Sequence, residues 1–267
     1  MPPRATRQPL GQHFLADPGW QQRIFKKLPI DSGQTWLEIG AGHGEMTALL
    51  ASGLAAVGGR VIAIETDERL VAALRERTAR EWTNVDIVAG DVLKVDLASL
   101  AGARCRVYGN LPYYITSPIL HRLFELAGRI DSIHIVVQLE VAARIVARPG
   151  RREHGYLSAA CQYFTKPEIS LRLPPGAFRP PPRVQSALVR MTLPGERASL
   201  GIASDDEFLD FVQRCFGQKR KTLRNNLRDL ADDGRIRAAM AAAGVRPDTR
   251  AEQLSVAQFA ALFRALA

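Results

Sequence analysis

The sequence is poor in cysteine. Only three cysteines occur among 267 residues, and no two of them form a Cys-x-x-Cys pair. An odd number of cysteines at unrelated spacings provides neither a disulfide framework nor a zinc site. We therefore expect reduced thiols and no bound metal.

Long hydrophobic runs are absent as well. No stretch of about 18 consecutive apolar residues occurs, and the first thirty residues contain no apolar segment of the secretory type. We expect a cytoplasmic protein without membrane contact. Hydrophobic residues nevertheless make up 46% of the chain, which is enough for a sizeable core in one large domain or two modest ones.

Positive charge is in excess, with a formal net charge of +9, and it is unevenly distributed. Residues 1–30 carry +4, residues 31–141 carry −4, residues 142–190 carry +7 and residues 191–267 carry +2. Lys and Arg beside phosphates give affinity by releasing counterions, so basic regions on both sides of an acidic one favour a nucleic-acid partner. The alternative is biased amino-acid usage, because 30 of the 36 basic residues are arginine.

The first half of the chain alternates short runs rich in Val and Ile with segments whose apolar residues have helical spacing. This alternation is typical of an α/β protein with a parallel, doubly wound sheet. Strands are expected at 36–39, 60–65, 85–89, 106–108 and 133–138, with helices at 45–52, 68–81 and 117–126.

The C-terminal part has a different pattern. A further strand is expected over residues 185–193, and the last sixty residues show helical periodicity without strand signals. The sequence therefore predicts a first domain at 1–194, a linker at 195–204 and a second, smaller all-helical domain at 205–267. The helices of that domain are expected at 210–215, 222–230, 236–243 and 256–266.

The first expected strand ends in a glycine-rich turn, Glu38-Ile-Gly40-Ala-Gly42-His-Gly44, that leads directly into a helix. Glycines at such a turn allow the backbone to approach a ligand closely. The spacing differs from the G-x-G-x-x-G of nicotinamide sites, which seats a pyrophosphate on a helix N-terminus. It is similar to the nucleoside site of S-adenosylmethionine-dependent methyltransferases. We therefore predict a Rossmann-like sheet of that type, with Gly40 and Gly42 against the cofactor.

Two acidic residues close the next two strands. Glu65 suits ribose hydroxyls, and Asp91 can accept a hydrogen bond from an adenine amine. Each residue also has a purely structural interpretation. Glu65 could cap the following helix, although Thr66 and Asp67 can already do so, and Asp91 beside Gly90 could form a turn.

A polar turn, Asn110-Leu111-Pro112-Tyr113, follows the fourth strand. At the carboxyl edge of the sheet it would place an amide, backbone carbonyls and an aromatic ring beside the cofactor. This set suits methylation of an adenine N6 amine. The Asn110 side-chain oxygen and a backbone carbonyl near Leu111 or Pro112 would accept the two amine protons, and Tyr113 would stack on the base. Taken alone, the motif also fits an ordinary turn with a buried tyrosine.

Together these residues resemble the ribosomal RNA adenine N6,N6-dimethyltransferase family. The resemblance extends over nearly the whole chain and is most specific at residues 110–118, 137–144, 178–186 and 216–226. It implies methyl transfer from S-adenosylmethionine, without a metal, to two adjacent adenosines in the 3′-terminal hairpin of 16S rRNA. The expected partner is a partly assembled small ribosomal subunit, and we expect the enzyme to be a monomer.

The resemblance also implies roles for residues at two further places. Phe178 would lie opposite Tyr113 and sandwich the target base. The alternative for Phe178 is packing in the core, but three prolines two residues further on suggest a rigid exposed loop. His13 and Leu15 would contact the cofactor. Because His13 stands where the family usually has asparagine and imidazole titrates near neutral pH, we expect cofactor affinity to vary between roughly pH 5.5 and 7.5.

Two basic segments are expected to hold the RNA. The first follows the fifth strand, and the second opens a helix on which Arg220, Arg224 and Arg228 would form one stripe. The alternative for such a stripe is an ordinary solvated helix face. The expected RNA-binding residues are Arg144, Arg148, Arg151, Arg152, Lys219, Arg220, Lys221, Arg224 and Arg228.

Two other functions share many of these features. A large-subunit rRNA adenine methyltransferase of the antibiotic-resistance type would have the same cofactor site and an Asn-x-Pro-aromatic turn. The 216–226 segment and the Phe178 loop favour the small-subunit enzyme. A noncatalytic assembly factor would keep the fold to bind RNA, but it would not need the pocket formed by residues 110–113.

Overall fold

The computed structural model describes residues 13–112 and 115–266. The chain divides into two compact units, one of residues 1–142 with 169–190 and another of residues 143–168 with 191–267. This division differs from the expected boundary at 195–204, because residues 143–168 belong with the C-terminal helices. All nine residues expected to bind RNA therefore fall in the second unit.

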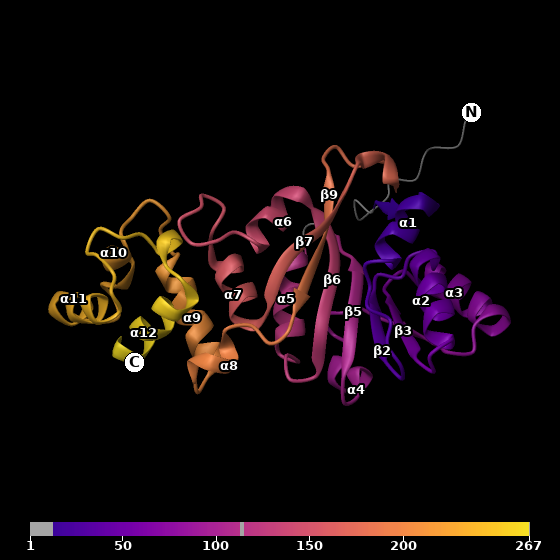
Figure 1. Cartoon of the computed structure of the whole chain (residues 1–267), viewed down its shortest axis with the longest axis horizontal. Helices are drawn as coiled ribbons and strands as arrows, with labels where there is room; N and C mark the ends of the chain where they lie inside the picture. Colours follow the sequence, from indigo (N-terminus) through magenta and orange to yellow (C-terminus); the bar gives the residue numbers. More distant parts are fainter. Residues whose placement is uncertain (1–12, 113–114, 267) are drawn as a thin grey trace. The chain divides into compact units, whose positions relative to one another are not determined.

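The first unit is built on a seven-stranded sheet with the order β4-β3-β2-β5-β6-β9-β7 (Figure 1). Strands β2 to β6 pair in parallel, which confirms the predicted α/β sheet. The chain proceeds outward from β2 in one direction to β4 and then returns to β5 on its other side. Such a switch point opens a crevice at the carboxyl ends of the strands. The strands are β2 (Thr35–Ile39), β3 (Arg60–Glu65), β4 (Val85–Ala89), β5 (Cys105–Asn110), β6 (Ile130–Gln138), β7 (Lys166–Leu173) and β9 (Ser186–Thr192).

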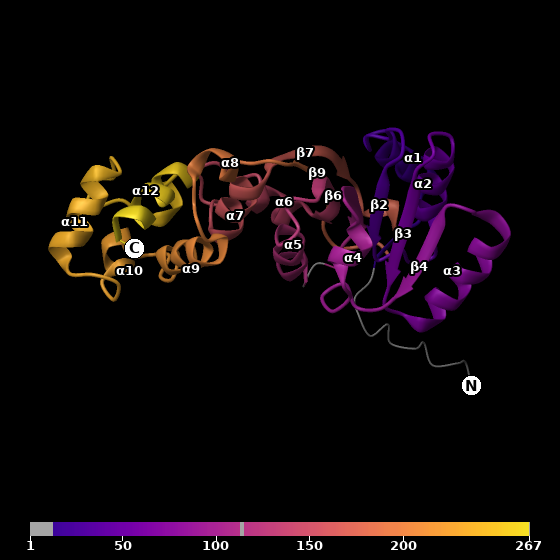
Figure 2. The same ribbon diagram turned by 90° about the horizontal axis from the view of Figure 1, so that it is seen from below.

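Helices cover the strands of this sheet, with α2 against β3 and α3 against β4 (Figure 2). Several helices begin where the sequence supplies a cap. Asp17, Asp67 and Asp96 each accept a hydrogen bond from a backbone N–H of the following first turn, at α1, α3 and α4. The helices are α1 (Pro18–Phe25), α2 (Glu45–Ala55), α3 (Glu68–Glu81), α4 (Leu97–Ala101), α5 (Thr116–Phe124) and α6 (Leu139–Ile145).

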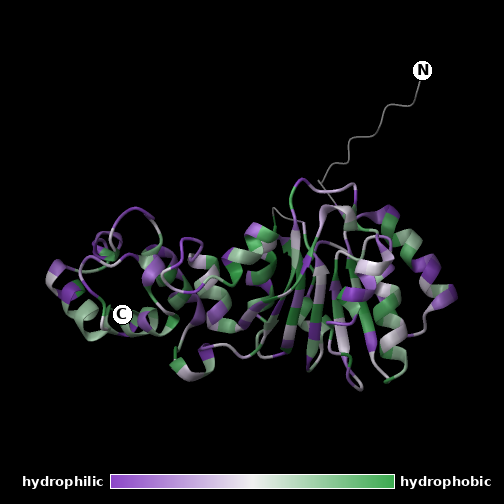
Figure 3. Cartoon of the chain, turned by 45° about the horizontal axis from the view of Figure 1, so that its top comes forward, coloured by the Kyte–Doolittle hydropathy of each residue, from purple (hydrophilic) through white to green (hydrophobic). Residues whose placement is uncertain are grey.

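The core lies on both faces of the sheet. Along β3, Val61 and Ala63 face one layer and Ile62 and Ile64 face the other, and all four are buried. Strands buried on both faces consist almost entirely of apolar residues, as the sequence pattern indicated. Figure 3 shows hydrophobic residues along the strands and hydrophilic residues on the outer turns of the helices.

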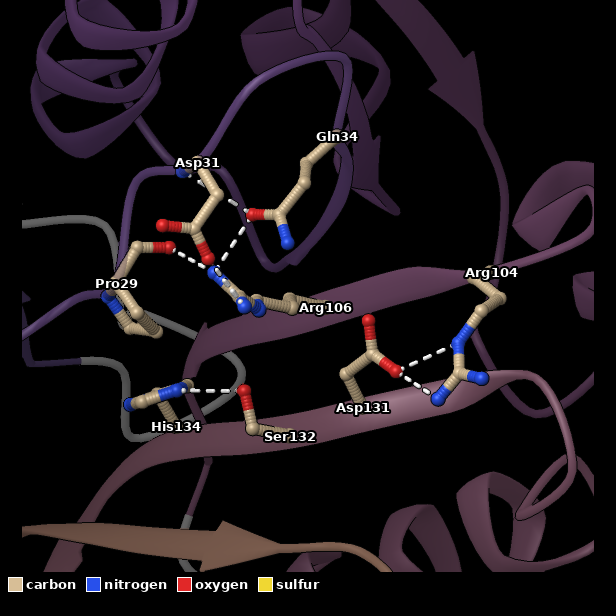
Figure 4. A network of polar contacts seen from close by, with 8 residues as sticks. All are labelled: Pro29, Asp31, Gln34, Arg104, Arg106, Asp131, Ser132 and His134. Atoms are coloured by element: carbon tan, nitrogen blue, oxygen red, sulfur yellow. Dashed lines mark hydrogen bonds and ion pairs between the residues drawn. The ribbon is translucent and has the colours of Figure 1, made fainter.

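Polar contacts fasten the loop before β2 to β5 (Figure 4). The Arg106 guanidinium donates to Gln34 Oε1 at 2.6 Å and to Asp31 Oδ2 at 2.7 Å. On the neighbouring strand, His134 Nε2 lies 2.9 Å from the Ser132 hydroxyl. Burial lowers the pKa of His134 to about 3, and nearby arginines act in the same direction. The ring is therefore neutral at physiological pH and serves as part of the core.

A second, two-stranded sheet joins residues that are far apart in the sequence. Strand β1 (Phe14–Leu15) pairs antiparallel with β8 (Phe178–Arg179), with Leu15 opposite Phe178. This pairing brings the N-terminal segment beside the proline-rich loop. The exposed position expected for Phe178 is wrong: its side chain is 0% exposed and belongs to the hydrophobic core.

Apart from the ends of β7 and β9, the regular elements in the described part of the second unit are helices. An aromatic cluster lies in its core, where Phe208 contacts Tyr163 with ring centroids 4.7 Å apart and Phe263 at 5.7 Å. Four helices, α9 to α12, match the expected ones, whereas α7 was not predicted and a short α8 lies within the expected linker. The helices are α7 (Tyr156–Phe164), α8 (Arg197–Leu200), α9 (Asp205–Cys215), α10 (Leu223–Leu227), α11 (Asp233–Ala242) and α12 (Val256–Leu266).

The predicted arginine stripe on one helix is wrong. Helix α10 begins only at Leu223, because Thr222 has an extended backbone with ψ 157°. Arg220 lies before the helix, in a turn that the Lys221 N–H closes by donating to the Gln218 carbonyl at 3.0 Å. Arg220 therefore does not continue the helical spacing of Arg224.

His154 is a buried, titratable side chain in the second unit. The side chain is 1% exposed and contacts the Phe216 ring, with centroids 6.1 Å apart. Burial lowers the pKa of His154 to about 4, with the Glu252 backbone acting in the opposite direction. An unfolded chain would therefore bind a proton between about pH 6.5 and 4 that the folded chain does not bind.

This difference makes the folded state less stable as the pH falls through that window. Between pH 7.5 and 5, His154 should account for a loss of about 2 kcal/mol in the free energy of unfolding. His154→Phe keeps an aromatic ring but cannot be protonated, so the variant should lose this part of the pH dependence. Urea unfolding of both proteins at the two pH values tests the prediction, and equal losses in both would contradict it.

Candidate active site

A pocket with an empty volume of about 780 Å³, partly open to solvent, lies at the carboxyl ends of β2, β3, β4 and β5. This is the edge at which open α/β sheets bind ligands. The pocket brings together most of the residues predicted from the sequence. Its walls are formed by His13, Phe14, Ile39, Gly40, Gly42, Ile64, Glu65, Thr66, Gly90, Asp91, Val92, Asn110, Leu111, Pro112, Ile115 and Ile119.

Two glycines of the turn after β2 line the pocket, whereas the third allows two helices to pack closely. Gly40 and Gly42 line the pocket with φ of 72° and 61°, a left-handed conformation that favours glycine. A Cβ on Gly42 would lie 3.2 Å from the Phe14 ring. Gly44 does not line the pocket, and a Cβ there would lie only 2.7 Å from Leu74 Cδ2. Gly44 therefore allows α2 to begin close against α3.

The Glu65 carboxylate connects the end of β3 to the glycine turn. Its Oε2 accepts a hydrogen bond from the Gly42 N–H at 2.8 Å, and its Oε1 accepts from the N–H groups of Thr66 and Asp67 at 2.8 and 3.0 Å. The cap of α3 is Asp67, which accepts from the Arg69 N–H, so helix capping does not explain Glu65. A carboxylate so fixed in the wall of the pocket is a preorganised acceptor for ligand hydroxyls.

Asp91 has a structural contact and a place in the pocket. Its Oδ1 accepts from the Leu93 N–H at 3.0 Å and thereby stabilises the turn after β4. Oδ2 forms no hydrogen bond with the residues that the structure describes. Asp91 can therefore stabilise the turn through Oδ1 and contact a ligand through Oδ2.

Glu38, the acidic residue of the glycine motif, lies in the core beneath the pocket. It is 2% exposed, and its Oε2 has no hydrogen-bond partner among residues 13–112 and 115–266. Burial raises the pKa of Glu38 to about 8, and the carboxylates of Glu45 and Glu65 act in the same direction against the Thr47 side chain. At neutral pH Glu38 is mainly protonated, so it adds little negative charge below the glycine turn.

The orientation of the Asn110 amide is fixed by the N-terminal segment. Asn110 Nδ2 donates to the His13 backbone carbonyl at 2.9 Å. Because a carbonyl can only accept, the amide nitrogen must face His13, which leaves Oδ1 as the atom that can accept protons from a substrate.

The His13 ring fastens this segment at its other side. Nδ1 lies 2.7 Å from the Pro180 carbonyl, so Nδ1 carries the proton. This bond ties the N-terminal segment to the loop that follows β8.

The two backbone carbonyls considered as the second proton acceptor differ in their surroundings. The Pro112 carbonyl accepts from the Ile115 N–H at 3.2 Å and from the Thr116 hydroxyl at 3.4 Å, at the start of α5. The Pro112 carbonyl is thus already engaged in the turn. This favours the Leu111 carbonyl as the second group that accepts a hydrogen bond from the target amine. The Leu111 N–H donates to Val136 on β6 at 3.1 Å and so fixes this peptide at the sheet edge.

Two predicted residues, Leu15 and Phe178, are not in the pocket wall. A third, Tyr113, lies outside the described residues. Leu15 is 5% exposed and faces the core, and its neighbour Phe14 lines the pocket instead. Phe178 is fully buried in the same core, so its ring cannot stack on a base without leaving that position.

Apolar residues form much of the wall and were not predicted. Phe14 lies edge-on to the His43 ring, with centroids 4.5 Å apart. Ile115 and Ile119 come from the start of α5, one helical turn apart. The four-residue spacing of these isoleucines after a polar turn could have indicated an apolar wall.

All the predicted RNA-binding residues except Arg224 are exposed, and Arg224 is half-buried. Two of them form ion pairs within the chain. The Arg224 guanidinium bonds the Asp233 carboxylate, and Arg228 Nε lies 3.6 Å from Asp229 Oδ1. The other members of the set have no ion pair with any residue that the structure describes.

Residues 13–112 and 115–266 contain no group of three or more His, Cys, Asp or Glu side chains that could hold a metal ion. None of their helices is both long enough and apolar enough to cross a bilayer. All three cysteines are buried free thiols.

The sequence is similar to bacterial rRNA methyltransferases over nearly its full length. It is 44% identical over 260 residues to the Ribosomal RNA small subunit methyltransferase A of Acidobacterium capsulatum, covering 96% of this chain and 90% of that protein. Identity to the protein of the same name from Xanthomonas campestris pv. campestris is 42% over 255 residues, with coverage of 95% and 94%.

Solved structures show the same fold. A dimethyladenosine transferase from Plasmodium falciparum superposes with a TM-score of 0.75 at 24% identity, covering 94% of this chain and 96% of that one. The 23S rRNA methyltransferase ErmE gives a TM-score of 0.72 at 26% identity, with coverage of 95% and 99%. The model of the family described as Ribosomal RNA adenine dimethylase matches residues 4–267. With that match over almost the whole chain and a pocket that combines Glu65, Asp91 and the oriented Asn110 amide, the protein belongs to the ribosomal RNA adenine dimethylase family.

Proposed function

We propose that the protein dimethylates N6 of two adjacent adenosines in the 3′-terminal hairpin of 16S rRNA, with S-adenosylmethionine as the methyl donor. The observation that carries this proposal is the orientation of Asn110, whose Nδ2 is committed to the His13 carbonyl at the edge of the pocket. This arrangement presents an acceptor to an incoming amine.

The pocket fits the adenosine part of S-adenosylmethionine. We assign Glu65 to the ribose hydroxyls, Asp91 Oδ2 to the adenine amine, and the backbone at Gly40 and Gly42 to close contact with the ligand. Ile64 and Val92 provide apolar surface beside these polar groups. The bound cofactor supplies an electrophilic methyl group.

Asn110 Oδ1 and the Leu111 carbonyl would each accept a hydrogen bond from one N–H of the target amine. The lone pair of an adenine amine is delocalised into the ring, which makes the nitrogen a poor nucleophile. Two such hydrogen bonds favour a pyramidal nitrogen whose lone pair points away from the acceptors. These hydrogen bonds strengthen as positive charge develops on the nitrogen, which is the condition for lowering the barrier.

Stacking of the target base is assigned to Tyr113 alone. Phe178 acts on the site indirectly, because its burial in the core supports β8 and thus the Pro180 carbonyl that holds His13. After transfer, the amine proton is acidic enough to leave to water, so no general base is required.

The exposed basic residues are assigned to the RNA. This set runs from Arg144 through Arg148 to Arg152 and continues at Lys219 to Lys221; Arg224 and Arg228 are its weakest members because each forms an ion pair. We propose a monomer that acts in the cytoplasm on a partly assembled small subunit. In this proposal, the first unit holds the methyltransferase site, and the second unit, which carries both basic segments, guides the RNA.

The similarity to ErmE makes a large-subunit substrate the alternative to be tested. Labelled S-adenosylmethionine is offered with undermodified small subunits, naked 16S rRNA and large subunits in parallel. We expect label in small subunits, approaching four methyl groups per subunit, with two on each adenosine. Preferential labelling of large subunits would overturn the proposal, and RNA binding without any label would support a noncatalytic assembly factor.

A further inference from the structure

The glycine turn after β2 is held by charged side chains from two other elements. Glu65, at the end of β3, accepts from the Gly42 N–H at 2.8 Å through its Oε2. Arg77, on α3, donates from Nη1 to the His43 carbonyl at 2.8 Å. Glu65 lines the pocket, whereas Arg77 is not among the residues of the pocket wall. The contact from Arg77 therefore concerns the turn itself.

The turn and α3 lie against each other at this point. A Cβ on Gly44 would lie 3.2 Å from Arg77 Nη1 and 3.3 Å from Trp82 Cη2. Trp82 is the C-cap residue of α3, so both contacts come from the C-terminal half of that helix. The Arg77 guanidinium thus reaches the turn without an intervening side chain.

The Arg77 side chain is itself held in place. Its guanidinium lies over the Trp82 ring, 4.7 Å from the centroid, and its Nη2 donates to Glu81 Oε2 at 3.3 Å. The side chain is 37% exposed, yet these contacts fix the direction of its donors. A donor that is already oriented can hold the His43 carbonyl at little further entropic cost.

Holding the His43 carbonyl restrains more than one atom of the turn. Because a peptide unit is planar, the direction of this carbonyl also sets the direction of the Gly44 N–H. That N–H donates to the Ala41 carbonyl at 3.0 Å and closes the turn. Since Glu65 holds the Gly42 N–H, the two charged side chains together restrain the backbone of residues 41–44.

The same turn supports an aromatic residue of the pocket wall. Phe14 lies edge-on to the His43 ring, with centroids 4.5 Å apart, and a Cβ on Gly42 would lie 3.2 Å from the Phe14 ring. A rotation of the His43 peptide would therefore disturb both the backbone at Gly42 and the surface on which Phe14 packs.

We propose that Arg77 is a positioning residue for S-adenosylmethionine: by holding the His43 carbonyl, it keeps the glycine turn in the conformation that receives the cofactor. This inference rests on the proposed placement of the cofactor in the pocket. Arg77 acts through the turn alone, so its loss should weaken cofactor binding without slowing the transfer step.

Variants on α3 separate this role from general effects of charge or helix stability. R77M removes the guanidinium, and R77K keeps the charge but replaces a fork that donates to two partners by a single ammonium group. R80M is the matched control, because Arg80 forms the same kind of ion pair on α3, from Nη2 to Glu76 Oε1 at 2.7 Å. E81Q removes the ion pair of Arg77 but leaves its bond to His43.

Calorimetry with S-adenosylmethionine alone gives the dissociation constants. The loss of one partly exposed hydrogen bond predicts about 3–10-fold weaker binding for R77M and about 2–5-fold for R77K. R80M and E81Q should bind like wild type. In methyl transfer to undermodified small subunits, R77M should raise KM for S-adenosylmethionine and leave kcat close to that of wild type.

A purely structural role would give a different result. R77M would then unfold at a lower temperature, but its dissociation constant would equal that of wild type wherever the variant is folded, and the proposal would be overturned. An equal loss of affinity in R80M or E81Q would also overturn it. If R77M does not fold, R77K decides, and wild-type affinity in R77K would contradict the proposal.

His43→Ala tests the route by which Arg77 acts. This change removes the ring that contacts Phe14 but keeps the carbonyl that Arg77 holds. R77M should therefore weaken cofactor binding by the same factor in the H43A background as in wild type. Disappearance of that factor would show that Arg77 acts through the ring and would overturn the assignment to the carbonyl.

Failure of the proposed function would be distinguishable from failure of this inference. In the first case no label would reach small subunits, although R77M would still bind S-adenosylmethionine more weakly than wild type. In the second case wild type would label small subunits fully, and R77M would bind the cofactor equally well.

Discussion

Replacing Asn110 with alanine should lower the rate of methyl transfer by about 10²–10³-fold, the range typical for the loss of one preorganised hydrogen-bonding group. Asn110 Nδ2 is held by the His13 carbonyl at 2.9 Å, so the lost acceptor is Oδ1, which faces the substrate. That contact gains strength mainly in the transition state. RNA affinity should therefore stay close to that of wild type.

Single-turnover rates with labelled cofactor and undermodified small subunits measure this effect. Asn225→Ala, which removes an exposed asparagine of α10 outside the pocket, is the matched control and should react at the wild-type rate. Full turnover by Asn110→Ala would refute the mechanism. Asn110→Asp keeps an acceptor oxygen but loses the N–H group that donates to the His13 carbonyl. This variant therefore tests the orientation of the side chain, and we expect its methyl-transfer rate to be lowered as well.

The second large effect is expected at Glu65. Its carboxylate accepts three backbone N–H groups, from Gly42, Thr66 and Asp67, at 2.8 to 3.0 Å. Glu65→Gln keeps the size of the side chain but replaces one acceptor oxygen by an NH₂ donor that would face other donors. Hydrogen bonds to charged groups contribute about 1.5–3 kcal/mol, so S-adenosylmethionine should bind about 10–100-fold more weakly.

Calorimetry without RNA measures this change directly. Glu68→Gln alters an exposed carboxylate three residues away, at the first turn of α3, and should bind the cofactor like wild type. Thermal unfolding of the variants without cofactor shows how far the glycine turn itself is destabilised. Equal dissociation constants for wild type and Glu65→Gln would show that Glu65 is only a structural link between β3 and the turn.

Local patterns were enough to predict the parallel sheet and the polar edge of its strands. Runs of Val and Ile separated by helical spacing define β2 to β6, and in a parallel sheet their carboxyl ends must share one edge. Glu65, Asp91 and Asn110 each follow a strand directly, so their convergence in one pocket followed from topology. Predicting this convergence required no knowledge of the distances between the three residues.

Long-range pairings could not be predicted in the same way. Strands β1 and β8 have two residues each, too few for any periodicity, and they are separated by more than 160 residues. Their pairing turns Phe178 into the core, whereas the prolines just after it are mostly exposed as expected. The bond from Asn110 to His13 uses a backbone carbonyl, which every residue has and which therefore leaves no mark in the sequence.

Charge patterns predicted a helical stripe of arginines that the structure does not contain. The four-residue spacing of Arg220, Arg224 and Arg228 predicted a stripe, yet Thr222 delays the helix and places Arg220 in a turn. The sequence also assigned the loop at 148–152 to the first domain. Packing of His154 on Phe216 brings this loop to the second unit, and only the folded structure reveals which arginines are paired.

The most direct measurement of the central claim is the position of dimethyladenosine in ribosomal RNA from cells that lack this protein. In the deletion strain, we expect the two adjacent modified adenosines of the 16S 3′-terminal hairpin to be unmodified, with 23S rRNA unchanged. The wild-type protein should restore them, and Asn110→Ala should not. Retention of both modifications in the deletion strain, or a loss confined to 23S rRNA, would contradict the assignment.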